Sequence, residues 1–325
     1  MTTTFTDRLR GIHAATIVPM RPDFSVDEDA LAAHIAAVTA VRGINGLLVN
    51  GHAGENFVLT LAEKRRVVEI ARAVSPGDCL IVSGVNHESS LEAAREAAQM
   101  EQAGADGLLV FPPNSWALGH ADECVLLHHR LVGEATTVPL MLYGAPVGAG
   151  AMSYGPALLT RLVADPRILA IKEGSWEVAT YEENLRLIRG LRPGFAVLGS
   201  GDEHLLTSYM IGSVGSQVSL AAVVPEVVVA LWEAAESGDW VTARAVHERL
   251  YALSVAIYRD APGGRATARL KTCLKLLGRL SHDGLRPPHA PCDRHEIAAL
   301  AAALRAAGAE SALDHAAPPR LAVPG

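Results

Sequence analysis

Eight short apolar runs recur along the chain, and they constrain its fold more than any other feature. Most are rich in Val, Ile and Leu and are continuous rather than alternating, which is typical of strands covered on both faces. They span residues 11–19, 46–50, 79–85, 107–111, 138–143, 168–172, 195–199 and 214–220. Amphipathic segments with helical spacing separate most of them. This alternation predicts an α/β protein with a (β/α)8 TIM barrel.

A doubly wound parallel sheet is the alternative fold. It usually has fewer strands, and a Gly-x-Gly-x-x-Gly turn often follows its first strand. No such turn follows residues 11–19. The helices expected between the strands are Asp27–Val41, Leu61–Val74, Ser89–Ala103, Asp122–Gly133, Tyr154–Ala164 and Trp176–Arg189.

After the eighth run, only helical patterns follow. We expect Pro225–Glu236 to be the last helix of the barrel, and Asp239–Tyr258, Arg265–Leu277 and Arg294–Ala307 to form an extension. The predicted organisation is a catalytic barrel over 1–238, a C-terminal helical extension over 239–309 and a mobile tail over 310–325. The tail contains three prolines and no apolar period.

Composition excludes several classes of function. The chain has 325 residues, of which 50% are hydrophobic and 19% charged, and its net charge is -7. This charge provides no basic surface for nucleic acid or for an anionic membrane. No signal peptide or membrane-spanning stretch is apparent. The four cysteines are widely spaced, which favours reduced thiols in a cytoplasmic protein over disulfides or a zinc site.

Lys172 is the residue most indicative of chemistry. The chain has 24 arginines and only four lysines, and Lys172 ends the apolar run 168–172. Burial would lower the pKa of its ammonium group and free the amine to attack a carbonyl. The alternative is a structural lysine that reaches solvent or pairs with Glu173.

In a barrel, catalytic groups lie at the carboxyl ends of the strands. By this rule the expected rim includes the turn of Gly51, His52, Ala53 and Gly54, then Tyr143 and Lys172, then Asp202 and Glu203, and finally Ser216 and Val218. A glycine-rich turn can direct N–H groups at a carboxylate, and a tyrosine beside a lysine can transfer protons while an imine forms. Asp202 and Glu203 could equally cap a following helix.

These motifs resemble the dihydrodipicolinate synthase and N-acetylneuraminate lyase family of Schiff-base aldolases. The resemblance covers about Gly11 to Ala307. Its motifs are Gly51-x-x-Gly-Glu55, Gly104-Ala-Asp106, Tyr143-x-x-Pro146, Ile171-Lys-Glu173, Gly201-Asp202 and Leu285-Arg-Pro-Pro288.

The resemblance implies a role for each part of this rim. Lys172 forms an imine with a 2-oxo acid such as pyruvate, Tyr143 is the acid/base group, and the Gly51–Gly54 turn holds the carboxylate. The carbonyl group of Val218 lies near the lysine. No metal or organic cofactor is needed, and the assembly is a homo-oligomer, either a dimer or a tetramer built as a dimer of dimers.

The chain also departs from the family pattern. His52 and Ala53 stand where the family usually carries two hydroxyl residues, and His52 either replaces one of them in a proton relay or faces solvent. The segment 111–116 lacks the tyrosine that synthases insert into a neighbouring site. The segment 147–150 lacks their carboxylate-binding arginine, and thus a bidentate clamp.

We therefore expect a Schiff-base lyase or aldolase for a hydroxylated or sugar-acid-derived 2-oxo acid, not for aspartate semialdehyde. Asp202, Glu203 and Ser216 would bind the substrate hydroxyls. The alternatives are a dehydratase or deaminase that uses the same imine, and a 2-oxo acid sensor with reduced catalysis.

Overall fold

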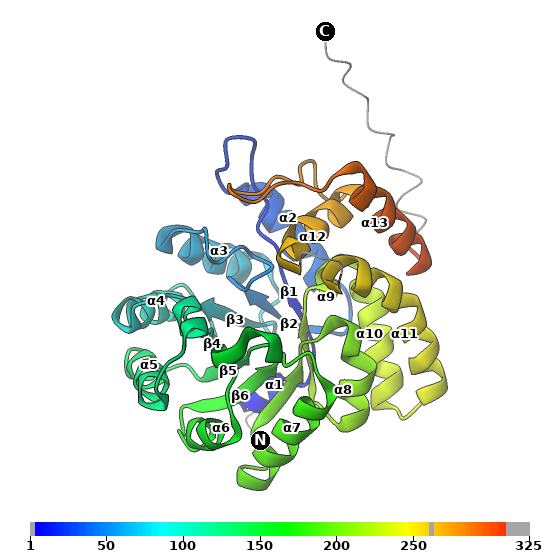
Figure 1. The fold of residues 1–325 in the computed structure, drawn as a ribbon. Helices are drawn as coiled ribbons and strands as arrows, with labels where there is room; N and C mark the ends of the chain where they lie inside the picture. The colour runs from blue at the N-terminus through cyan, green and yellow to red at the C-terminus, as the bar shows by residue number, and fades with distance from the viewer. Residues whose placement is uncertain (1–3, 260–262, 310–325) are drawn as a thin grey trace.

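Eight parallel strands form a closed barrel in the computed structural model, which describes residues 4–259 and 263–309 (Figure 1). The strands follow one another around the barrel in chain order, and β8 pairs with β1. Their bounds are β1 Gly11–Ala15, β2 Ile44–Val49, β3 Leu80–Val85, β4 Gly107–Val110, β5 Leu140–Gly144, β6 Ile168–Glu173, β7 Ala196–Gly199 and β8 Gly215–Val218. The predicted (β/α)8 TIM barrel is confirmed.

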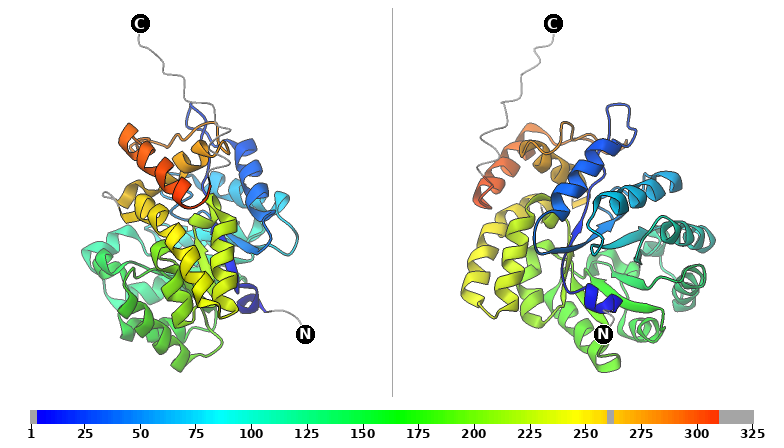
Figure 2. Two further views of the ribbon diagram at one scale, coloured as in Figure 1. Left: turned by 90° about the vertical axis from the view of Figure 1, so that its right-hand side faces the viewer. Right: turned by 180° about the vertical axis from the view of Figure 1, so that it is seen from behind.

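A ring of helices surrounds the strands (Figures 1 and 2). It consists of α2 Glu28–Thr39, α3 Leu61–Val74, α4 Ser90–Gln102, α5 Asp122–Glu134, α6 Pro156–Val163, α7 Val178–Leu191, α8 Leu205–Ile211 and α10 Pro225–Glu236. Side-chain caps define several starts: Thr60 and Glu63 form a reciprocal capping box at α3, and Asp27 caps α2. For α8, the sequence analysis gave no bounds and considered only that Asp202 and Glu203 could cap a helix after them; the start of α8 has no side-chain cap.

Two apolar layers hold the barrel together. The inner layer consists of side chains that point into the barrel, among them Leu48, Val82 and Met141. Phe5 and Leu9, in and just after the short helix α1 (Phe5–Arg8), pack against this layer. The outer layer lies between strands and helices. Residues at the carboxyl ends of the strands therefore remain available to form a site.

The barrel closes where two glycines meet. A Cβ atom on Gly215 of β8 would lie 2.0 Å from the carbonyl oxygen of Gly11 in β1. Any side chain at Gly215 would collide with the backbone of the neighbouring strand.

The C-terminal extension packs on the barrel as expected. It comprises α11 Trp240–Ser254, a π-helical turn Val255–Arg259, a 3-10 turn Gly263–Arg265, α12 Ala266–Leu276 and α13 Arg294–Ala306. Figure 1 shows α12 and α13 near α2, and α11 beside α10. A short helix, α9 (Leu220–Val223), contacts α12. The expected single helix over Asp239–Tyr258 is wrong at its end, because the π-helical turn begins at Val255.

The predicted mobile tail, 310–325, lies outside the described residues. None of the helices in the described ranges is long and apolar enough to cross a bilayer.

Candidate active site

Lys172 and Tyr143 occupy matching positions on adjacent strands. Tyr143 of β5 and Lys172 of β6 are Cα partners in the parallel ladder, so their side chains project to the same face. The Lys172 Nζ atom lies 5.9 Å from the centre of the Tyr143 ring. The strand pairing thus places the candidate nucleophile beside the candidate proton donor.

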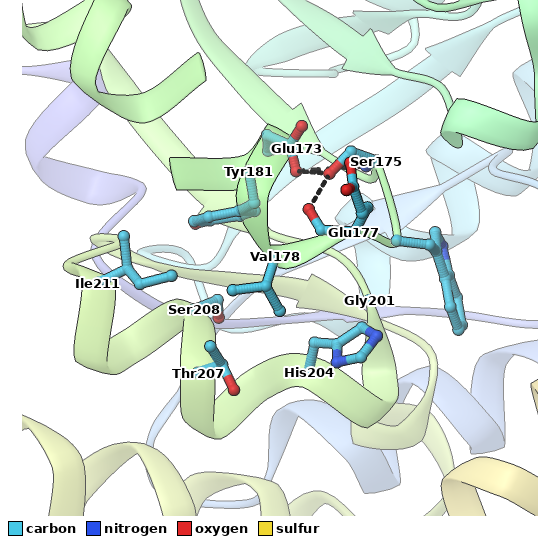
Figure 3. A pocket seen from close by; sticks show the side chains of 11 residues that line it. Glu173, Ser175, Glu177, Val178, Tyr181, Gly201, His204, Thr207, Ser208 and Ile211 are labelled. Atoms are coloured by element: carbon cyan, nitrogen blue, oxygen red, sulfur yellow. Dashed lines mark hydrogen bonds between the residues drawn. The ribbon is translucent and has the colours of Figure 1, made fainter. Parts of the chain in front are cut away.

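Glu173 projects to the opposite face of β6, towards the helices. Its carboxylate accepts hydrogen bonds from the Asn184 side-chain amide (3.0 Å) and from the Ser175 hydroxyl and amide (3.0 and 3.2 Å). Figure 3 shows Glu173 beside Ser175 and Tyr181 in a small cavity of about 20 Å³ behind the strand. The alternative that Lys172 pairs with Glu173 is therefore wrong.

The surroundings of Lys172 favour its neutral amine. Burial lowers the pKa of Lys172 to about 8, and attraction to the nearby Asp202 carboxylate opposes this shift. With a pKa of about 8, about one molecule in ten carries the neutral amine at pH 7. An ordinary lysine would have about one in three thousand. Burial thus makes the Lys172 amine available for nucleophilic attack.

Lys172 lies in a cavity of about 420 Å³ at the carboxyl ends of the strands. The cavity receives side chains from the strand ends, from the loops that follow them and from the C-terminal extension. The lining residues are Ala15, Leu48, His52, Ala53, Phe57, Phe111, Tyr143, Pro146, Lys172, Trp176, Ser200, Asp202, Ser219, Tyr258, Gly264, Ala266, Thr267 and Leu270. This volume accommodates a small organic acid.

A polar cluster stands beside the lysine. The Asp202 carboxylate accepts a hydrogen bond from the amide of Leu220 (2.9 Å), and the hydroxyls of Ser219 and Tyr258 are 2.5 Å apart. Burial raises the pKa of Asp202 to about 6, against the opposing effects of Leu220 and Lys172. At neutral pH, Asp202 is therefore an anion that can stabilise a cation formed on Lys172.

The turn after β2 places His52 inside the cavity rather than in solvent. Its ring stacks on Phe111 at 4.4 Å between centroids and meets Tyr143 edge-on at 5.2 Å. Burial, assisted by the Lys172 charge, lowers the pKa of His52 to about 3, so the imidazole is neutral. The expectation of a solvent-facing histidine is wrong, while its role in a proton relay stays a prediction.

Helix α12 holds this turn through side-chain contacts. The Lys271 ammonium forms a buried ion pair with Glu55, which follows Gly54 directly. One helical turn earlier, the Thr267 hydroxyl donates to the carbonyl of His52 (3.3 Å). Within the turn, the Gly54 amide donates to the carbonyl of Gly51 (3.0 Å). The extension thus fixes the segment that carries His52 and Ala53.

A model of the dihydrodipicolinate synthetase family matches residues 8–307. The chain belongs to this family. Its relatives include 4-hydroxy-tetrahydrodipicolinate synthase 1 of Streptomyces coelicolor, 32% identical over 289 residues, covering 89% of this chain and 91% of the relative. The 4-hydroxy-tetrahydrodipicolinate synthase of Phenylobacterium zucineum is 32% identical over 302 residues, which cover 92% and 97% of the two chains.

A family member of known structure has the same fold. It is the prophage protein YagE of E. coli K12, solved in complex with pyruvate, which has a TM-score of 0.85 and 26% identity and covers 92% of this chain and 99% of its own. Membership in the family identifies the chain as an enzyme of the lysine-imine lyase type.

In the present chain, two of the residues expected to bind substrate hydroxyls bond to other side chains. The Glu203 carboxylate pairs with the guanidinium of Arg259 at 2.8 Å, and the Ser216 hydroxyl bonds to that of Tyr209 at 2.8 Å. Neither residue lines the cavity. The predicted trio of hydroxyl-binding groups is therefore reduced to Asp202.

Gly51, Gly54 and Val218 also lie outside the cavity lining. The two glycines shape the turn rather than contact the cavity, and the Val218 side chain is buried in the outer apolar layer. The proximity of the Val218 carbonyl group to the lysine remains a prediction.

The sequence analysis overlooked several residues that line the cavity. Trp176 follows β6 closely, so the strand-end rule could have identified it. Phe57 lies beyond the turn after β2, and Tyr258 and Leu270 belong to the extension. No motif marks these three, because only the folded chain brings them to the cavity.

Proposed function

We propose that Lys172 forms an imine with the C2 carbonyl of a pyruvate-type 2-oxo acid, and that the enzyme uses this imine to cleave or form a carbon–carbon bond. The observation that carries the proposal is the lysine of lowered pKa in the cavity, with Tyr143 and Asp202 nearby. The protonated imine withdraws electrons from C3, so the reaction requires no other electron sink.

Tyr143 is proposed to move protons during imine formation. Burial raises the pKa of Tyr143 to about 12, so its hydroxyl is protonated at neutral pH and can donate to the carbinolamine oxygen as that oxygen leaves as water. Asp202 would then face the iminium cation as its counter-charge. The combination supports acid–base catalysis without a charged histidine.

The carboxylate of the 2-oxo acid is proposed to bind at the turn after β2. In the described part of the chain, the amides of His52 and Ala53 have no hydrogen-bond acceptor, and both residues line the cavity. Backbone amides can replace the usual hydroxyls as anion ligands, because they carry partial positive charge.

The substrate chain beyond C3 is proposed to carry no second carboxylate. Lys172 is the one cationic side chain among the described lining residues. A distal carboxylate would therefore lie near Asp202 without a cation to pair with. This argues against aspartate semialdehyde as the partner, although relatives are named 4-hydroxy-tetrahydrodipicolinate synthases.

Borohydride trapping tests the imine. Incubation with pyruvate and borohydride should add one reduced pyruvyl group, which peptide mapping should locate on Lys172. Lys172→Arg should abolish the adduct because a guanidinium does not form the imine. Lys275→Arg, in which the replaced lysine is half-exposed, is the matched control and should keep it. An adduct on another lysine would overturn the assignment.

The same imine could instead support loss of water or ammonia. Release of pyruvate and an aldehyde marks carbon–carbon cleavage, whereas turnover without pyruvate marks dehydration or deamination. Binding without any turnover would support the sensor alternative.

A homo-oligomer, most simply a tetramer, and a cytoplasmic location are also proposed. The homo-oligomer is supported by two exposed apolar side chains, Leu118 and Val147. They lie on the adjacent turns Asn114–Leu118 and Val147–Met152. The cytoplasmic location is supported by the four free cysteines. Light scattering coupled to gel filtration measures the assembly directly.

A further inference from the structure

The cavity is divided between polar and aromatic surfaces. Around Lys172 lie Asp202, Tyr143 and Ser219, which suit the 2-oxo acid head. The segments beyond the strand ends contribute rings and aliphatic groups instead: Phe57, Trp176, Pro146, Ala266 and Leu270. A substrate bound at Lys172 would extend from polar surroundings into this apolar part.

One wall of the cavity is a continuous series of rings. The His52 ring is 4.9 Å from Phe57 and 4.4 Å from Phe111, and Phe111 is 4.6 Å from Tyr143. The series leads from Phe57, which is 50% exposed, to the tyrosine beside the lysine. Phe57 therefore leaves half of its surface exposed while it lines the cavity, where a bound ligand can contact it.

A second pair of rings also lines the cavity. Trp176 and Tyr258 lie 5.7 Å apart, tilted by 55°. Trp176 has a φ of +58°, a left-handed conformation that is strained for a tryptophan. Such strain is retained where a side chain must be held in one place, often at a ligand site.

The polar groups of this outer part are largely occupied. The Thr267 hydroxyl donates to the carbonyl of His52, and the Tyr258 hydroxyl is bonded to Ser219. Across the described lining residues no arginine is present, and the charged side chains are Lys172 and Asp202. The chemistry of this part suits a flat, uncharged group.

We propose that the group attached to C4 of the substrate is an uncharged aromatic ring, so that the enzyme interconverts a 4-aryl-4-hydroxy-2-oxobutanoate with pyruvate and an aromatic aldehyde. The inference rests on the imine chemistry proposed above. It names the partner that this imine accepts: a ring seated among Phe57, Phe111 and Trp176.

The reaction needs no net co-reactant, because the water released as the imine forms is taken up again when the imine is hydrolysed. Tyr143, which gave its proton to the departing carbinolamine hydroxyl, takes up the C4 hydroxyl proton. The C3–C4 bond breaks, the aldehyde C=O forms, and the electron pair becomes a C2–C3 double bond that neutralises the iminium nitrogen. Tyr143 then gives this proton to C3, which restores the iminium. Water adds to C2 and returns a proton to Tyr143, and collapse of the carbinolamine releases pyruvate and the Lys172 amine.

Steady-state kinetics with three substrates tests the inference. They are 4-hydroxy-2-oxo-4-phenylbutanoate, 4,5-dihydroxy-2-oxopentanoate and 4-hydroxy-2-oxopentanedioate, which differ in the group on C4. We expect kcat/KM for the phenyl compound to exceed both others by about tenfold or more. An equal or higher value for the hydroxylated compound or the dicarboxylate would overturn the inference.

Variants locate the preference in the rings. Trp176→Ala and Phe57→Ala should each lower the ratio of kcat/KM for the phenyl over the dihydroxy compound by about three- to tenfold. Trp240→Ala and Phe24→Ala remove partly exposed rings that do not line the cavity, and they should keep the wild-type ratio. A ratio that falls equally in all four variants would contradict the assignment.

Trapping on the same preparation separates this inference from the proposed function. A pyruvate adduct on Lys172 without a preference for the phenyl compound rejects the aromatic partner and leaves the imine standing. Absence of the adduct rejects both.

Discussion

Replacing Lys271 with methionine removes a charge that has no exposure to solvent. The Lys271 ammonium pairs with the buried Glu55 carboxylate and donates to the carbonyl of Gly284 (2.9 Å). Methionine has nearly the same length, so the substitution removes the charge and leaves most of the packing. It should destabilise the protein and loosen the turn that carries His52.

The magnitude follows from burial. Side-chain exposure is 0% for Lys271 and 3% for Glu55, so the carboxylate left behind would have almost no solvent to pair with. Loss of one partner of such a pair costs about 3–5 kcal/mol of unfolding free energy. Glu55→Gln combined with Lys271→Met removes both charges and should recover most of that loss.

Lys275 provides the matched control on the same helix. Its side chain is 49% exposed and pairs with Asp283 at 2.7 Å, so Lys275→Met should cost less than about 1 kcal/mol. Urea unfolding measures all three variants. Equal losses in Lys271→Met and Lys275→Met, or a double variant no better than Lys271→Met, would refute the reasoning. A raised KM for the 2-oxo acid in folded Lys271→Met would further indicate that the pair positions the turn.

Three further predictions concern the groups around the imine. The rate of borohydride trapping should rise about tenfold per pH unit below about pH 8 and level off above it, because attack requires the neutral amine of Lys172; a rate still rising at pH 10 would contradict the lowered pKa. Asp202→Asn should move this profile to lower pH, since the Asp202 charge raises the pKa of Lys172; an unchanged profile would mean that the two groups do not interact. Tyr143→Phe should lower kcat by about 10²-fold while trapping persists, and an unchanged kcat would assign proton transfer to another group.

The barrel was predictable because each strand is buried on both faces and therefore appears as an unbroken apolar run. The ends of the strands were less predictable than the barrel itself. The apolar run 11–19 continues past Ala15, the last residue of β1, because the loop that follows is also buried. Helix α8 has seven residues, too few to display a helical period in the sequence.

The site was predictable where chemistry follows strand position. Lys172 and Tyr143 were identified because they stand at strand ends, and the ladder pairs them. The partner of Glu203 could not be identified, because Arg259 reaches it from a π-helical turn in the extension. His52 was ambiguous, since a sequence does not record that the ring of Phe111 stacks against it.

The cavity has two separately encoded parts. Strands β5 and β6 supply Tyr143 and Lys172, whereas Leu270 on α12 and Tyr258 before it come from a segment outside the barrel. Substitutions in that segment can alter which partner fits without disturbing the residues that make the imine. Diversification of the extension alone is thus a route by which one carbon–carbon bond chemistry can acquire new partners, in nature or in a laboratory library.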